Sequence, residues 1–138
     1  DNHKQNKAHY VTALVDKILE QDNINGNTIN LLGTGAPLRQ FTYTGDIADI
    51  LKTMIDNNIL QSFNVSTPET YSIHELATIT LKALNKDHWG IIYSSPKLDG
   101  QYRKDVSVEK MNKIIPGFIF TTFSDGIKKV YNGKKQIQ

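Results

Sequence analysis

The charged side chains of the segment SSPKLDGQYRK, residues 94–104, are the strongest candidates for chemistry in this sequence of 138 residues. Lys97, Arg103 and Lys104 contribute cations and Asp99 contributes a carboxylate, around an Asp-Gly turn signal. Cations grouped in this way can hold a diphosphate, while a carboxylate accepts a hydrogen bond from a hydroxyl or a base. The segment therefore fits a sugar-nucleotide contact, although a solvated charged loop has the same pattern.

A second candidate is Arg39, which follows a glycine pair in the segment LLGTGAPLRQF. Gly33 and Gly35 begin the spacing of a phosphate-binding loop, but Leu38 stands at the third glycine position. Pro37 also disfavours helical geometry in the residue before it. We therefore predict a turn between two short strands. Arg39 has a guanidinium that can bind phosphate or carboxylate in two-point fashion, but the sequence alone favours a surface arginine that pairs with a nearby acid.

His9 precedes the first expected helix and is the candidate acid or base, because imidazole titrates near neutral pH. The histidines show no metal-ligand spacing and the chain has no cysteine, so no metal site is predicted. Two Tyr-x-x-x-Lys matches start at Tyr93 and Tyr131. Pro96 and the pair Asn132-Gly133 are expected to break a helix within them, so both matches are interpreted as coincidences.

The elements that must position these residues follow from apolar periodicity and turn signals, and they indicate a mixed α/β fold with short strands. Strands are expected at residues 29–33, 39–44, 62–66 and 89–95, the first two forming a hairpin. Helices are expected from residue 10, from Thr44 as cap, from the Ser72–Glu75 capping box, from 107 to about 113, and from about 122.

Composition narrows the classes of function. There are 16 Lys and Arg against 14 Asp and Glu, and a net charge of +2 does not indicate nucleic acid or a membrane surface as a partner. No apolar run approaches the ~20 residues of a membrane span, and no secretory signal is recognisable, so a cytoplasmic location is expected. The length predicts a single domain over residues 1–138, cut from something longer.

The order of four segments matters more than any single motif: DN…H, LGTGAPLRQFTYTGDIAD, FNVST…YSIHELA and SSPKLDGQYRK. Together they resemble the C-terminal half of the extended short-chain dehydrogenases/reductases, the NAD-dependent epimerase/dehydratase family. The patterns K-x-DGQ-x-x-K and PGFIFTTF are similar to the branch that acts on GDP-4-keto-6-deoxymannose. The resemblance implies a small α/β substrate-binding domain, the C-terminal part of a Rossmann-type enzyme that couples epimerisation at two carbons to NADPH reduction of a ketone.

The resemblance also implies roles for particular residues. His9 matches the histidine that acts as acid or base and lies near the NADP(H) cofactor. Lys17 stands where the family has a substrate-binding arginine, which keeps the charge but not the fork. Leu32 stands where some members have a tryptophan that stacks on the substrate. Three further residues match contacts to the GDP-sugar: Arg39, Asp99 and Lys104.

The family's N-terminal glycine-rich cofactor loop and Tyr-x-x-x-Lys helix have no counterpart in this sequence. We therefore expect the chain to act beside a separate N-terminal Rossmann domain, to hold no NADP(H) by itself, to be inactive alone and to form a homo-oligomer. Two alternatives stay open. The chain is the C-terminal domain of another nucleotide-sugar epimerase or dehydratase, or it is a free-standing, non-catalytic sugar-nucleotide-binding or interaction module.

Overall fold

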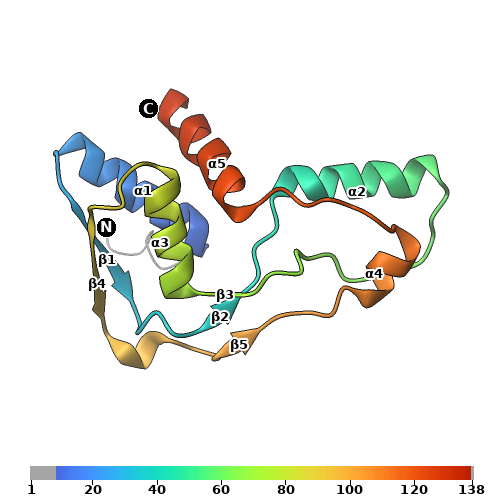
Figure 1. Ribbon diagram of the computed structural model, residues 1–138, viewed down its shortest axis with the longest axis horizontal. Coiled ribbons are helices and arrows are strands. Elements are labelled where there is room, and N and C mark those ends of the chain that lie inside the picture. The colour runs from blue at the N-terminus through green and yellow to red at the C-terminus, as the bar shows by residue number, and fades with distance from the viewer. Residues whose placement is uncertain (1–8, 138) are drawn as a thin grey trace.

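The computed structural model describes residues 9–137, which form helices and short strands in alternation (Figure 1). The helices are α1 (Tyr10–Asn23), α2 (Thr44–Asp56), α3 (Ile73–Ala83), α4 (Glu109–Ile114), α5 (Phe123–Ile137) and the short 3-10 helix η2 (Pro96–Leu98). The strands are β1 (Thr28–Leu32), β2 (Leu38–Arg39), β3 (Tyr71–Ser72), β4 (Gly90–Ser94) and β5 (Arg103–Lys104). The predicted mixed α/β class with short strands is confirmed.

The larger apolar core lies at one end of the molecule, where α1, α3 and α5 gather beside the β1–β4 sheet (Figure 1). Ile29 and Leu31 of β1 are buried while Leu32 is exposed, as expected for a strand with one covered face. The α1 stripe predicted from periodicity is buried at four positions: Leu14, Val15, Ile18 and Leu19.

A smaller apolar cluster lies at the other end, where α2 and α4 come together (Figure 1). Its buried members are Ile50, Met111 and Ile115. The apolar periodicity of this helix predicts a buried face made of Ile47, Ile50, Leu51, Met54 and Ile55. The prediction was wrong for two of them, because Leu51 is 53% exposed and Ile55 is 76% exposed. This cluster covers only one side of α2.

The predicted hairpin was wrong. β1 pairs in parallel with β4, whereas β2 pairs antiparallel with β3 and parallel with β5. Residues 33–37 therefore carry the chain from one sheet to another instead of returning it beside β1. The predicted strands at 39–44 and 62–66 were also wrong beyond Arg39, because these residues find no strand partner among residues 9–137.

The helix ends agree with the sequence in part. The capping box of α3 is confirmed, with the Ser72 hydroxyl accepting from the Glu75 N–H at 3.0 Å and the Glu75 carboxylate accepting from the Ser72 N–H at 2.7 Å. Thr44 was predicted as a cap, but Tyr43 holds the N-cap position of α2. The pair Asn132-Gly133 does not end α5, which continues to Ile137.

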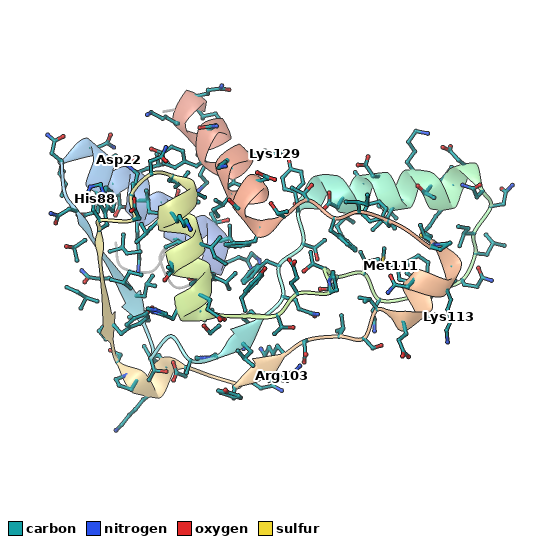
Figure 2. The ribbon with its side chains drawn as sticks, in the orientation of Figure 1. Asp22, His88, Arg103, Met111, Lys113 and Lys129 are labelled. Atoms are coloured by element: carbon teal, nitrogen blue, oxygen red, sulfur yellow. The ribbon has the colours of Figure 1, made fainter. Side chains whose placement is uncertain are left out.

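Contacts with α1 explain why α5 continues through that pair. The Tyr131 hydroxyl donates to the Asp22 carboxylate at 2.5 Å, and Lys134 forms an ion pair with Asp16. Figure 2 shows Asp22 on α1 and Lys129 on α5, the two helices that these contacts join. Within the described residues, no helix has the length and apolar character needed to cross a membrane.

Candidate functional site

Two of the predicted cations meet in the small sheet of β3, β2 and β5. Arg39 on β2 and Lys104 on β5 are direct register partners in the parallel pair. The pairing is extended by the Leu38 N–H, which donates to the Tyr102 carbonyl at 2.7 Å. Strand pairing thus brings together the backbones of two cationic residues that are 65 positions apart in the chain.

The guanidinium of Arg39 is partly engaged by the backbone. Its Nη1 donates to the Leu38 carbonyl at 2.7 Å and reaches the Tyr102 carbonyl at 3.4 Å. Among residues 9–137, neither Nε nor Nη2 of Arg39 donates a hydrogen bond. The half of the fork that suits a two-point contact with an anion is therefore open.

A polar pocket of about 480 Å³ adjoins this sheet. Its lining residues are Gln40, Thr42, Val65, Ser66, Gln101, Arg103, Lys104, Asp105 and Val106. Gln40 fixes two walls, because its amide N–H donates to the Thr67 carbonyl at 3.1 Å and its oxygen accepts from the Val106 N–H at 2.8 Å. The pocket is therefore held in shape by a half-buried side chain that links two of its walls.

The charges of this pocket are not equivalent. Arg103, which lies on β5 in Figure 2, donates to Asp105 from Nε at 2.8 Å and from Nη2 at 2.6 Å. These bonds hold the pKa of the Asp105 carboxyl below its usual range and raise that of Arg103. Lys104 makes no ion pair with the residues the structure describes, so its charge is available to a ligand.

The Asp99 carboxylate accepts hydrogen bonds from Thr34 in the Gly33–Gly35 turn. Its Oδ1 accepts from the Thr34 N–H and its Oδ2 accepts from the Thr34 hydroxyl, both at 2.6 Å. These two bonds lower the pKa of the Asp99 carboxyl. Sequence reasoning proposed this carboxylate as a ligand contact, and the structure shows that its nearest partner is Thr34.

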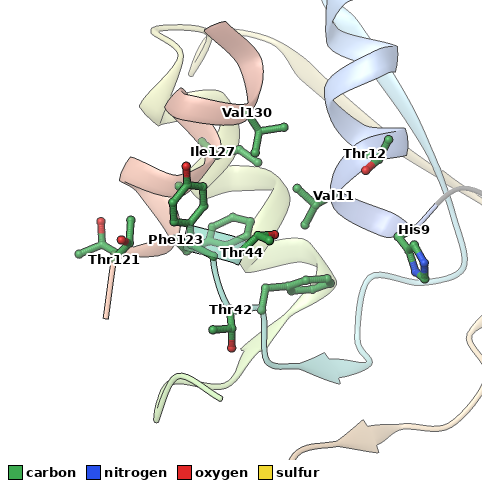
Figure 3. A pocket seen from close by; sticks show the side chains of 13 residues that line it. His9, Val11, Thr12, Thr42, Thr44, Thr121, Phe123, Ile127 and Val130 are labelled. Carbon is green, nitrogen blue, oxygen red and sulfur yellow. The ribbon is translucent and has the colours of Figure 1, made fainter. Parts of the chain in front are cut away.

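His9 lies on a second pocket, of about 400 Å³, between the start of α1, the segment before α2 and the start of α5. Figure 3 shows His9 and Thr12 at one side of this pocket and Phe123, Ile127 and Val130 at the other. The walls are mainly apolar. His9 is exposed and its side chain forms no cap on α1, so the imidazole is accessible. Thr42 lines both pockets, which are therefore neighbours.

The structure does not bring Lys17 and Leu32 into either pocket. The Lys17 ammonium donates to the Asn30 carbonyl at 2.5 Å, on β1. Leu32, at the end of the same strand, is 58% exposed. Lys17 thus reaches from α1 to β1, and Leu32 ends that strand just before the Gly33–Gly35 turn.

The described residues do not fit a dinucleotide cradle. The Gly33–Gly35 turn leads into β2 rather than a helix, and the Thr34 N–H already donates to Asp99.

The tyrosines of the two Tyr-x-x-x-Lys matches both have partners within the chain. The Tyr93 hydroxyl oxygen lies 2.7 Å from the Nδ1 of His74, and burial raises the pKa of Tyr93. The Tyr131 hydroxyl is bound to Asp22, which together with burial raises its pKa to about 12.

No group of three or more His, Cys, Asp or Glu side chains in residues 9–137 is arranged to hold a metal ion. The Asp1-Asn2 pair that contributed to the family resemblance lies outside the described residues.

Comparison with known proteins places the chain. A model of the NAD-dependent epimerase/dehydratase family matches residues 1–66. A GDP-L-fucose synthase from Dictyostelium discoideum is 29% identical over 132 residues, which are 94% of this chain and 41% of that protein. A GDP-L-fucose synthetase from Naegleria fowleri superposes with a TM-score of 0.79 at 25% identity, over 96% of this chain and 40% of that one. Residues 1–66 thus match the NAD-dependent epimerase/dehydratase family, and the chain as a whole is similar to part of GDP-L-fucose synthases.

Two further comparisons give the same similarity. A probable GDP-L-fucose synthase from Drosophila melanogaster is 26% identical over 92% of this chain and 42% of its own length. The Naegleria fowleri protein has also been solved bound to NADP, again with a TM-score of 0.79, at 26% identity over 94% of this chain and 40% of that chain. The chain thus spans about two fifths of the length of the relatives it matches.

Several residues that shape the site carried no recognisable signal in the sequence. Thr34 and Gln40 lie in segments where a polar residue predicts only a solvent-exposed side chain. Each nevertheless makes two hydrogen bonds to residues distant in the sequence. In the sequence, Asp46 is simply an acid suited to the first turn of a helix, yet it binds Thr121 through both carboxylate oxygens. These roles depend on partners more than 20 residues away in the chain.

Proposed function

We propose that this chain provides the GDP-sugar-binding part of an enzyme of the GDP-L-fucose synthase type. Such an enzyme epimerises GDP-4-keto-6-deoxymannose at two carbons and reduces its ketone with NADPH. The observation that carries the proposal is the strand pairing of Arg39 with Lys104, which lines a polar pocket. The names of the chain's relatives give the ligand class.

The two cations suit a diphosphate for a physical reason. The open Nε–Nη2 edge of Arg39 can take two phosphate oxygens at once, and the Lys104 ammonium adds a mobile point charge beside it. A hydrogen bond to a charged group contributes roughly 1.5–3 kcal/mol. Loss of either cation is therefore expected to weaken binding by at least tenfold.

His9 is proposed to move protons in the epimerisation steps. Its imidazole is exposed at the pocket that adjoins the polar one through Thr42, where a sugar attached to the bound diphosphate would extend. An imidazole near neutral pH can both remove a proton from a carbon next to a ketone and return one. The proposed division is that Arg39 and Lys104 anchor while His9 reacts.

The hydride source is proposed to lie outside these residues, on a Rossmann domain that precedes them and holds NADP(H). The exposed apolar side chains at the α2 end are its proposed contact surface: Leu51, Ile55, Leu60 and Ile119. By itself the chain would bind the GDP-sugar without reducing it. We also propose that the uncovered surface makes the isolated chain self-associate, which light scattering over a range of concentrations would measure.

Thermal unfolding with added GDP tests the proposal. A ligand at about 100 times its Kd adds about 2.7 kcal/mol to stability, which raises the Tm by several degrees. Arg39→Ala and Lys104→Ala should abolish the rise, whereas Lys113→Ala on the distant helix α4 should keep it (Figure 2). No rise with the unaltered chain would reject the proposal.

The choice of nucleotide is tested in the same assay. UDP and dTDP carry the same diphosphate on other bases, so they separate the anion contacts from recognition of guanine. A rise with GDP alone supports the fucose synthase type. An equal rise with all three nucleotides favours another nucleotide-sugar epimerase or dehydratase.

A further inference from the structure

The Gly33–Gly35 turn binds a carboxylate of this chain, the side chain of Asp99. The Asp99 carboxylate receives the Thr34 N–H on one oxygen and the Thr34 hydroxyl on the other, each at 2.6 Å. The Thr34 hydroxyl oxygen accepts in turn from the Ala36 N–H at 3.2 Å. Backbone and side chain of one residue thus hold a carboxylate that lies 65 positions away in the chain.

Gly33 leaves the space that this contact needs. A Cβ on Gly33 would lie 2.3 Å from the Oδ1 of Asp99, and the residue has a φ of +87°. Both facts favour glycine at this position. The glycine that resembles part of a phosphate loop is thus explained by the approach of Asp99.

The contact between Thr34 and Asp99 precedes both cations of the proposed site, Arg39 and Lys104, along the chain. From Thr34 the chain runs through the turn to Arg39 on β2, and from Asp99 it runs through Gly100 to Lys104 on β5. The two segments have the same length, and they join at one end through Asp99 and at the other through strand pairing. A link at the open end of this pair fixes how the two strands align.

We propose that Asp99 is a positioning residue, which closes the glycine turn through Thr34 and thereby holds Arg39 beside Lys104, and that it does not contact the ligand. The inference rests on the proposed function and differs from a simple transfer of the family pattern, in which Asp99 touches the GDP-sugar. Its effect on the ligand is exerted through the alignment of β2 with β5.

Three variants separate the two roles. Asp99→Ala removes both contacts with Thr34. Asp99→Asn removes the charge but keeps an oxygen for the Thr34 N–H and an N–H for the Thr34 hydroxyl oxygen. Thr34→Val removes the hydroxyl but keeps the backbone N–H bond to Oδ1, so only the Asp99 Oδ2 is freed to meet a ligand.

Titration of each variant with GDP by calorimetry gives the decisive comparison. We expect Asp99→Ala and Thr34→Val each to weaken GDP binding by about tenfold, Asp99→Asn to retain most of it, and the double variant Thr34→Val/Asp99→Ala to be no worse than Asp99→Ala alone. If Thr34→Val binds GDP as the unaltered chain does while Asp99→Asn loses as much as Asp99→Ala, the carboxylate contacts the ligand and the inference is overturned.

A second measurement keeps the inference separate from the proposed function. Amide exchange of Thr34 and the pKa of the Asp99 carboxyl, both followed by NMR, need no ligand. The unaltered chain should show a protected Thr34 amide and a lowered Asp99 pKa, and Thr34→Val should move both towards ordinary values. An unprotected amide with an ordinary pKa in the unaltered chain would overturn the inference whether or not GDP binds.

Discussion

Asp46 joins the two ends of the molecule, and its removal should destabilise the whole fold. It lies in the first turn of α2 and is 5% exposed. Its Oδ2 accepts from the Thr121 N–H at 2.8 Å and its Oδ1 from the Thr121 hydroxyl at 2.7 Å, just before α5 begins. Each bond to a charged acceptor is worth roughly 1.5–3 kcal/mol. Since water can reach the half-buried Thr121 after truncation, we expect Asp46→Ala to cost about 3 kcal/mol.

Urea unfolding followed by the fluorescence of Trp89 measures this cost, and thermal unfolding should show a Tm lower by about 9 °C. The matched control is Asp49→Ala, an exposed acid on the same helix, with an expected change under about 0.5 kcal/mol. Thr121→Val should make the Asp46→Ala change less costly, by about 1 kcal/mol or more in a double-mutant cycle. Equal effects of Asp46→Ala and Asp49→Ala would refute the idea that this contact joins the two ends.

Four further outcomes are expected. Leu76→Ala, at a fully buried position of α3, should lower the free energy of unfolding by about 2–5 kcal/mol in urea unfolding, unlike an exposed leucine. Gly33→Ala should destabilise by more than about 1 kcal/mol because of its positive φ and its contact with Asp99. By contrast Gly133→Ala in α5, with open space around it, should stabilise by about 0.5–1 kcal/mol, and a loss there would contradict the helix seen through that position. Hydrogen bonds lower the carboxyl pKa of Asp99 and of Glu75 in the folded chain. The free energy of unfolding that they contribute is therefore present above about pH 4 and should fall as the pH drops through the pKa values of the folded chain. This fall should be shallower in Asp99→Asn.

Local signals predicted the helices well because their causes are local. The α1 stripe and the Ser72–Glu75 capping box depend on residues three and four positions apart, and both are present as expected. Such patterns specify a helix wherever a core exists to cover one face.

The strand pairing could not be derived in this way. β1 finds its partner in β4, about 60 residues later, and the turn at 33–37 gives no sign that it changes sheets. β2, β3 and β5 are two residues long each, too short for an alternating pattern. Their alignment depends on contacts such as that of Thr34 with Asp99.

The site shows the same limit. Arg39, Lys104 and Asp99 could be singled out as charged residues near turns, and the family resemblance assigned them to a ligand. The sequence could not reveal that Arg39 and Lys104 are register partners or that Asp99 is already bound by Thr34. Conversely, Asn132-Gly133 looked like a helix end, but the contacts of Tyr131 and Lys134 with α1 hold α5 together across it.

The proposed function depends most on whether Arg39 and Lys104 bind a diphosphate. The direct measurement is the dissociation constant of GDP for the unaltered chain and for the double variant Arg39→Ala/Lys104→Ala, by calorimetry at two salt concentrations. We expect measurable binding that weakens with salt and falls by at least about a hundredfold in the double variant. Equal binding by the two proteins, or none by the unaltered chain, would contradict it.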